Sequence, residues 1–150
     1  MAAIWIDADA CPRAIREIIV KGATRTHTVA TFVANHALPI QRSVNISVLC
    51  VPQGADAADR LIVERANAGD LIITADLPLA YDAIEKGALV ITPRGEPLDR
   101  DNIKARLGMR DFFETLRASG EHTGGQKTLG ERDIRDFANA FDRLLTRISR

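Results

Sequence analysis

Short apolar segments alternate with helical patterns through the first two thirds of this chain. The apolar segments, each typical of a buried strand, are residues 4–6, 28–34, 46–51, 71–74 and 89–92. Helical patterns lie between most of them, over residues 13–20, 55–69 and 79–86. Strands that alternate with helices of this length pair in parallel, with helices on both faces of the sheet. The sequence therefore predicts an α/β fold, a three-layer sandwich around a mainly parallel sheet.

Proline and glycine indicate where the helices begin and end. Pro12 is expected to begin the first helix and Gly22 to end it, and glycines also follow the next two helices. Two C-terminal helices are expected over residues 102–118 and 133–148. Between them, residues 119–130 contain four glycines, which predicts a mobile loop. We expect a single α/β domain over residues 1–150.

Composition narrows the class of protein. A chain of 150 residues with 46% hydrophobic and 27% charged residues is typical of one globular domain, and it excludes disordered, collagen-like and coiled-coil classes. No apolar run approaches the roughly 18 residues of a membrane span, and acids interrupt the N-terminal segment, so we expect a cytoplasmic protein. Cys11 and Cys50 have no metal-ligand spacing and are expected to be reduced and packed.

The charges balance over the whole chain. Lys and Arg total 20, Asp and Glu total 20, and the net charge is zero, so no global positive field indicates a nucleic-acid partner. The net charge is −2 through residue 98 and +2 from Asp99 onward. Sixteen of the 20 basic residues are Arg, the better bidentate partner for phosphate, which permits such a partner without requiring one.

Five acids map to one edge of the predicted sheet. Asp7 and Asp9 follow the first strand, Asp56 and Asp59 lie in the first turns of a helix, and Asp76 follows the fourth strand. Ligands of parallel sheets collect at this carboxyl edge. Asp7 and Asp9 share a face if the strand continues, and Asp56 and Asp59 share a helix face. Carboxylates this close repel one another unless a cation binds them, and oxygen ligands favour Mg²⁺ or Mn²⁺.

Helix capping is the alternative role for three of these acids. Asp56 and Asp59 suit a helix N-terminus, and Asp76 precedes a Leu-Pro pair as a good N-cap does. Asp7 has no expected helix to cap. Their coincidence at one edge favours a shared metal site, with Asp7, Asp56, Asp59 and Asp76 as catalytic candidates and phosphoryl transfer as the chemistry.

Other polar residues are weaker candidates. His27, His36 and His122 are scattered along the chain, and we expect them to be surface or structural residues. Arg94, just beyond the last strand, and Lys127, in the glycine-rich loop, are candidate substrate phosphate contacts. A plain surface arginine and a linker remain the alternatives, because the loop lacks the spacing of a P-loop.

Several segments carry a family resemblance. They are IWIDADACP (4–12), GADAADRLIV (54–63), GDLIITADLPLA (69–80), KGALVITPRG (86–95) and SGEHTGGQK (119–127). They resemble the signature blocks of the uncharacterised bacterial YaiI/YqxD family, whose arrangement is similar to PIN-like metal-dependent ribonucleases. The resemblance implies Mg²⁺ or Mn²⁺ bound by Asp7, by Asp56 or Asp59, and by Asp76. PIN domains commonly place a Glu deeper in the helix, which leaves the identity of the helix ligand open.

Three functions follow as hypotheses. The first is a Mg²⁺- or Mn²⁺-dependent nuclease acting on RNA or single-stranded nucleic acid, although the zero net charge counts against it. The second is a small-molecule phosphatase, because IWIDADA also resembles the DxD opening of haloacid-dehalogenase-like enzymes, with Asp7 as nucleophile and Asp9 as acid/base. A convincing downstream Lys and acid pair is missing for that interpretation. The third is a non-catalytic binding or regulatory module.

Overall fold

A computed structural model describes residues 2–52, 57–109 and 129–149 of the chain. The strands are β1 (Ile4–Asp7), β2 (Ala30–Ala34), β3 (Ile46–Cys50), β4 (Leu71–Ile73), β5 (Leu89–Ile91) and β6 (Pro97–Leu98). The helices are the 3-10 turn η1 (Ala8–Ala10), α1 (Arg13–Thr26), α2 (Ala57–Arg65), α3 (Leu77–Glu85) and α5 (Glu131–Ile148). Residues 103–109 are also helical.

The six strands form one sheet in the order β3-β2-β1-β4-β5-β6. Strands β1 to β5 are parallel, and β6 pairs with β5 in the antiparallel direction. The chain moves outward from β1 to β3 and then returns to the other side of β1 at β4. In such doubly wound sheets, ligands bind where the strand order reverses, beyond the carboxyl ends of the strands. The sheet therefore places this point between the ends of β1 and β4.

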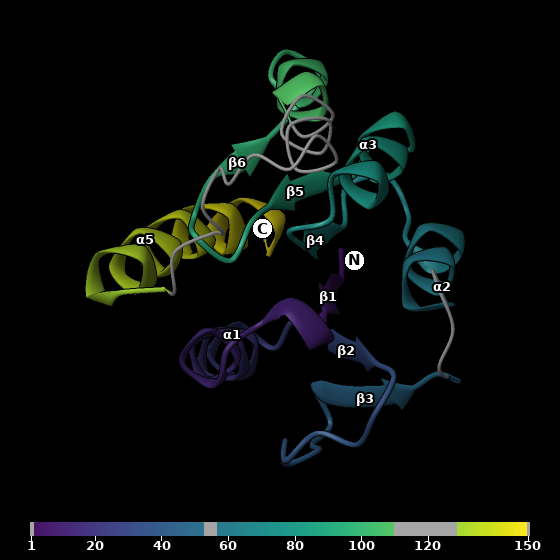
Figure 1. The fold of residues 1–150 in the computed structure, drawn as a ribbon. Coiled ribbons are helices and arrows are strands. Elements are labelled where there is room, and N and C mark those ends of the chain that lie inside the picture. Colours follow the sequence, from purple (N-terminus) through teal and green to yellow (C-terminus); the bar gives the residue numbers. More distant parts are fainter. Residues whose placement is uncertain (1, 53–56, 110–128, 150) are drawn as a thin grey trace, which may run out of the picture.

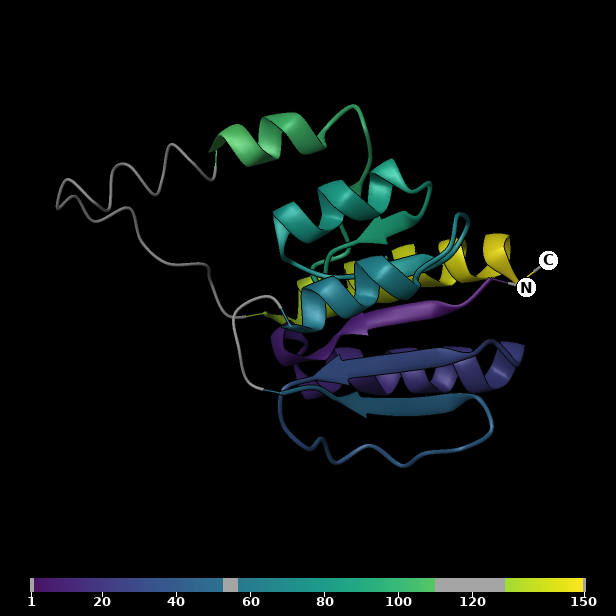
Figure 2. The same cartoon turned by 90° about the vertical axis from the view of Figure 1, so that its right-hand side faces the viewer.

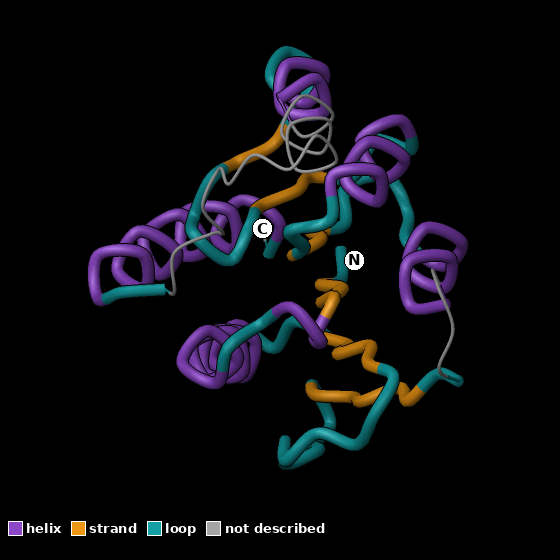
Figure 3. The backbone as a smooth tube through the Cα atoms, in the orientation of Figure 1, coloured by secondary structure: helices purple, strands orange, loops and turns teal. Residues whose placement is uncertain are grey.

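Helices cover both faces of the sheet. Figure 1 shows α1 and α5 on one face and α2 and α3 on the other, and the tube in Figure 3 shows the strands between them. This arrangement confirms the predicted three-layer α/β sandwich. Every residue of β2 and β4 is buried, as expected for strands covered on both faces. No helix in the described ranges is long and apolar enough to cross a membrane.

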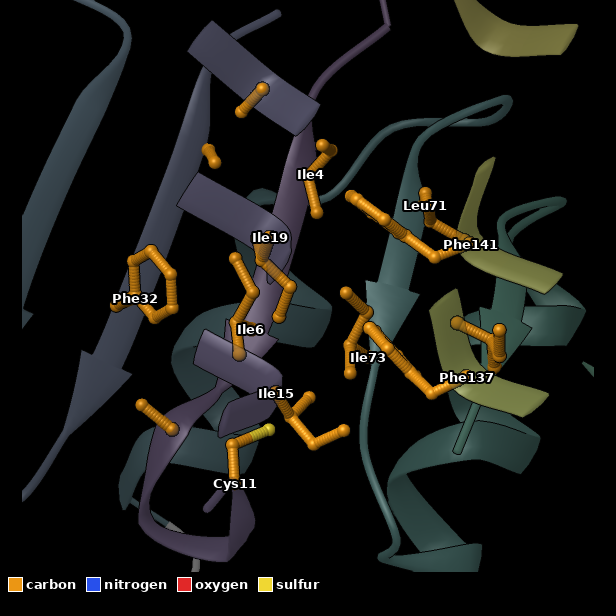
Figure 4. Packing of buried hydrophobic residues seen from close by; sticks show 14 of the residues in the cluster. Ile4, Ile6, Cys11, Ile15, Ile19, Phe32, Leu71, Ile73, Phe137 and Phe141 are labelled. Atoms are coloured by element: carbon orange, nitrogen blue, oxygen red, sulfur yellow. The ribbon is translucent and has the colours of Figure 1, made fainter. Parts of the chain in front are cut away.

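Two apolar cores hold the layers together. In the core on the α1 and α5 face, Phe137 and Phe141 project from α5 toward the sheet, as Figure 4 shows, and their rings stack with centroids 5.5 Å apart. On the other face, Ile62 of α2 and Leu79 of α3 pack against Ile72 of β4. This double core gives the strand ends a rigid frame.

Gly22 does not end α1, and that prediction was wrong. Helix α1 continues to Thr26 and ends at His27, which adopts the left-handed conformation with φ of 54°. A Cβ at Gly22 would lie 2.8 Å from Phe141 Cε2 and 2.9 Å from Leu145 Cδ2. This glycine is therefore a packing residue that lets α5 approach α1, and local sequence patterns do not reveal this contact.

Two further expectations need correction. The strand ending at Ile91 is not the last, because the turn at residues 93–95 leads into β6. Cys11 is buried as predicted, but Cys50 is exposed at the end of β3, which lies at the edge of the sheet. Residues 110–118 of the expected helix 102–118 lie outside the described residues, and so does most of the predicted glycine-rich loop, up to residue 128.

Candidate functional site

Asp7 ends β1 at the point where the strand order reverses. Its residue is 8% exposed although it carries a carboxylate. Thr74, which directly follows β4 and is fully buried, donates a hydrogen bond from Oγ1 to Asp7 Oδ2 at 2.9 Å. Because β1 and β4 are neighbours in the sheet, this hydrogen bond joins the carboxyl ends of the two strands that flank the switch point. The other oxygen, Oδ1, makes no hydrogen bond to the described residues.

Asp76 lies next to this pair and caps α3. Its backbone N–H donates to Thr74 Oγ1 at 3.0 Å, and its Oδ1 accepts from the backbone N–H of Leu79 at 2.9 Å. A proline occupies the first turn of the helix. The predicted N-cap role of Asp76 is therefore confirmed. It involves only Oδ1, and Oδ2 makes no hydrogen bond within the described part of the chain.

The surroundings of Asp7 disfavour its charged form. Burial raises the pKa of the Asp7 carboxyl above its usual value, and the negative charges of Asp76 and Asp9 raise it further. The hydrogen bond from Thr74 opposes this shift without cancelling it. Asp76 and Asp9 are thus close enough to act electrostatically on Asp7. A cation near Asp7 would remove this penalty.

Asp7 and Asp9 were expected to share a face only if the strand continued, and this condition is not met. The strand ends at Asp7, and the 3-10 turn η1 directs Asp9 toward the end of β2. There Asp9 Oδ2 accepts from the backbone N–H of Asn35 at 3.0 Å, and Asp9 Oδ1 lies 3.0 Å from His36 Nδ1. His36 is more than half exposed, as expected, but its contact with Asp9 places it at the rim of the site. No spacing in the sequence signals this contact, which arises because β1 and β2 are neighbours.

The remaining predicted acids lie elsewhere or outside the described residues. Asp59 lies in the first turn of α2 and lines an open groove of about 760 Å³ between α2 and α3, together with Asp82. It is not among the groups that shift the pKa of Asp7. Asp56 lies outside the described residues. The structure therefore brings together Asp7, Asp76 and Asp9, and it places Asp59 in the neighbouring groove.

The two predicted phosphate contacts have different outcomes. Arg94 follows β5 at the expected edge, and its Nη1 donates to Asp133 Oδ2 at 2.9 Å in the first turn of α5. Both side chains are about one third exposed, so this pair links the turn after β5 to the start of α5. Lys127 lies outside the described residues.

The carboxylates at the switch point are the type of ligand that a hard divalent cation prefers. Within the described ranges, no group of three or more His, Cys, Asp and Glu side chains is arranged to hold a metal ion. Mg²⁺ usually keeps several waters, however, and is bound by one or two carboxylates together with substrate phosphates. Asp7 and Asp76 are two such carboxylates, and each has one oxygen without a hydrogen bond to the described residues.

These features define a doubly wound α/β protein with carboxylates at its switch point. The family model described as "Uncharacterized BCR, YaiI/YqxD family" matches residues 5–147. The chain belongs to this family, which confirms the resemblance of its sequence blocks.

Curated bacterial relatives carry the name UPF0178 protein. One from Vibrio vulnificus is 52% identical over 147 residues, covering 98% of this chain and 99% of the relative. Another from Saccharophagus degradans is 54% identical, covering 96% of this chain and 95% of the relative. A third from Hydrogenovibrio crunogenus is 53% identical, covering 98% and 97%. No solved structure was found to match the chain.

Proposed function

We propose that this protein is a Mg²⁺- or Mn²⁺-dependent nuclease of PIN-like type, which hydrolyses phosphodiesters in RNA or single-stranded nucleic acid. One observation carries the proposal. The carboxylate of Asp7 lies at the switch point, where its burial, and to a smaller extent the charges of Asp76 and Asp9, raise its pKa. A protein gains no stability from such an arrangement without a counter-charge, and perturbed groups of this kind are frequent at functional sites.

Each residue has a defined part in the proposal. Asp7 and Asp76 would hold the ion, with Asp56 or Asp59 as the proposed helix ligand, and Asp9 lies at the rim. When bound, such an ion neutralises charge on a phosphodiester and lowers the pKa of a bound water. Thr74 fixes the orientation of the Asp7 carboxylate, and the N–H of Leu79 fixes that of Asp76. Preorganised carboxylates of this kind need no rearrangement when the substrate binds.

The geometry favours a nuclease over a phosphatase of the DxD type. In the phosphatase hypothesis, Asp7 is the nucleophile and Asp9 is its acid/base partner. One oxygen of Asp7 is held by a fully buried threonine, and Asp9 is directed toward Asn35 and His36. The position of Asp9 does not suit an acid/base partner of a covalent phosphoenzyme, whereas the second oxygen of Asp7 is available in either hypothesis. An ion site needs only the oxygens that Asp7 and Asp76 leave available.

Cleavage of end-labelled single-stranded RNA with Mn²⁺ tests the proposal, with EDTA as the blank. We expect Asp7→Asn to reduce the cleavage rate by about 100-fold or more. Loss of a residue that only supports a metal ligand typically costs about 10- to 100-fold, and loss of a ligand itself should cost more. Asp101→Asn is a matched control, because Asp101 is exposed and follows the edge strand β6, three strands away from β1, and it should cleave at the parental rate. Phosphate release from p-nitrophenyl phosphate with intact RNA would indicate the phosphatase. The absence of both activities and of Mn²⁺ binding would indicate the non-catalytic module.

A further inference from the structure

Helix α5 presents a face of arginines to solvent. Arg132, Arg135, Arg143 and Arg147, hereafter the arginine face, are all exposed. At 3.6 residues per turn they lie on the side of the helix opposite the buried Phe137, Phe141 and Leu145. The sequence is polar on this side throughout the helix, with Asn139 and Thr146 between the arginines.

The charge of the arginine face is not neutralised by ion pairs. None of its four members forms an ion pair with a described residue. Two nearby acids are already paired elsewhere, Asp133 with Arg94 and Asp142 with Arg25. Glu131 and Asp136 remain, so the exposed charges on this side of the helix sum to about +2.

The spacing of the arginines is unfavourable for the helix itself. Arg132 and Arg135 are three residues apart, and Arg143 and Arg147 are four residues apart. Like charges at these spacings destabilise a helix, whereas opposite charges stabilise it. Glu131 lies four residues before Arg135 and Asp136 four residues after Arg132, but Arg143 and Arg147 have no acid three or four residues away in α5. Pairing within the helix therefore does not explain Arg143 and Arg147. An external polyanion would explain them.

The arginine face begins near the carboxyl edge of the sheet, where the candidate metal site lies, and extends toward the opposite edge. The contact between Arg94 and Asp133 places the start of α5 at the carboxyl edge, and Figure 2 shows the helix running from the arrowheads of the strands back toward the termini. From Arg132 to Arg147 it covers about 22 Å at 1.5 Å per residue. An open notch of about 370 Å³ lies beside it, and two arginines, two acids, a glycine and an asparagine line it: Arg94, Arg143, Glu96, Asp136, Gly95 and Asn139.

We propose that the arginine face binds the phosphate backbone of single-stranded nucleic acid and guides it to the carboxyl edge of the sheet. The inference rests on the proposed function for the identity of the polyanion. A local basic face of this kind also resolves the conflict between a zero net charge and a nucleic-acid substrate, since binding depends on the arginines that neutralise phosphates.

Other partners of a basic helix fit less well. A helix that lies on a membrane inserts its apolar face, but the apolar face of α5 is buried against the sheet and α1. The large exposed hydrophobic residues in the described ranges are Val29, Val44 and Met109, and none is on α5, so this face lacks an apolar seam for a partner helix. It also lacks aromatic side chains for base stacking. Binding should therefore be independent of base sequence and sensitive to salt.

Fluorescence anisotropy with a labelled 12-nucleotide RNA, and with DNA of the same sequence, tests this in EDTA. Four phosphate contacts predict a slope of log K against log salt of about −2.8, so parental affinity falls about 50-fold between 50 and 200 mM salt. Arg143→Gln with Arg147→Gln should reduce that loss to about 7-fold, the slope falling by about 0.7 for each arginine. The matched control is Arg65→Gln with Arg100→Gln, two exposed arginines outside α5, and it should retain the parental slope.

Several results would overturn the proposal. One is that the parental protein does not bind the RNA at 50 mM salt. Another is that the slope of log K against log salt is unchanged in the α5 variant, or that the slope falls equally in the control variant. Competition by poly-glutamate as strong as that by RNA would indicate an acidic protein instead. Binding of only one of the two strands would contradict recognition through phosphate alone. EDTA removes divalent cations, so the binding assay is independent of the cleavage assay. RNA binding without Mn²⁺-dependent cleavage refutes the nuclease only. Cleavage together with an unchanged salt slope in the α5 variant refutes the arginine face only.

Discussion

Replacing Thr74 with valine removes a hydroxyl while keeping the shape of a fully buried side chain. Thr74 Oγ1 donates to Asp7 Oδ2 at 2.9 Å and accepts from the Asp76 backbone N–H at 3.0 Å. A hydrogen bond to a charged group is worth about 1.5–3 kcal/mol, and a neutral one about 1 kcal/mol. We therefore expect the free energy of unfolding at pH 7 to fall by about 2.5–4 kcal/mol. For a chain of this size, that lowers Tm by about 5–15 °C.

This loss should depend on pH with a definite sign. The pKa of Asp7 is raised on folding, so the native protein binds the proton more tightly than the unfolded chain does. The free energy of unfolding then falls as pH increases from the ordinary value of 3.8 through the raised native pKa. Without the Thr74 hydroxyl the native pKa of Asp7 rises further. The penalty of the valine variant should be greatest at neutral pH and smaller at pH 4.

Urea unfolding followed by circular dichroism measures both effects. Thr74→Ser is the matched control, because it keeps the hydroxyl and loses only a methyl group, at a cost of about 1 kcal/mol. In the Asp7→Asn background, Thr74→Val should cost at least about 1 kcal/mol less, since no buried charge remains. A cost below about 0.5 kcal/mol, or an equal cost in both backgrounds, would refute the view that Thr74 stabilises a buried charge.

Three further predictions concern stability and reactivity. Without divalent cations, Asp7→Asn should raise the free energy of unfolding at pH 7, because it removes the disfavoured buried charge. The same variant should show a smaller fall in the free energy of unfolding as pH increases above 4. Urea titrations at several pH values check both effects. Gly22→Ala should lower the free energy of unfolding by about 1–3 kcal/mol, because its Cβ would lie 2.8 Å from Phe141 Cε2; equal Tm values would contradict this. Cys50 should react rapidly with a thiol reagent at pH 8, whereas Cys11 should react only on unfolding, because burial raises its pKa to about 12; mass spectrometry of the labelled chain distinguishes them.

The fold class and the acid at the carboxyl end of the first strand could be predicted from sequence. Short apolar runs separated by helical patterns determine the layers, and an acid that ends an apolar run must lie at a strand end. The N-cap at Asp76 was also predictable, because its residue type and the following proline act within one turn. These features depend on local chemistry and on one rule about parallel sheets.

The rest depends on contacts between distant segments. The 3-10 turn after Asp7 directs Asp9 to His36, a neighbour only because β1 and β2 pair. Gly22 reads as a helix end by local rules, but it is a contact point for α5. The ion pair between Arg94 and Asp133 likewise requires the position of α5 on the sheet. Local sequence patterns carry no information about which elements become neighbours.

The central claim is that Asp7 and Asp76 bind a divalent cation, and Mn²⁺-dependent thermal unfolding tests it most directly. At Mn²⁺ concentrations of about 100 times Kd, the parental protein should gain about 2.7 kcal/mol, seen as a rise in Tm of about 5–11 °C. Asp7→Asn should abolish that rise, and Asp101→Asn should retain it in full. A parental Tm unchanged by Mn²⁺, or an equal rise in the Asp7→Asn variant, would contradict the account.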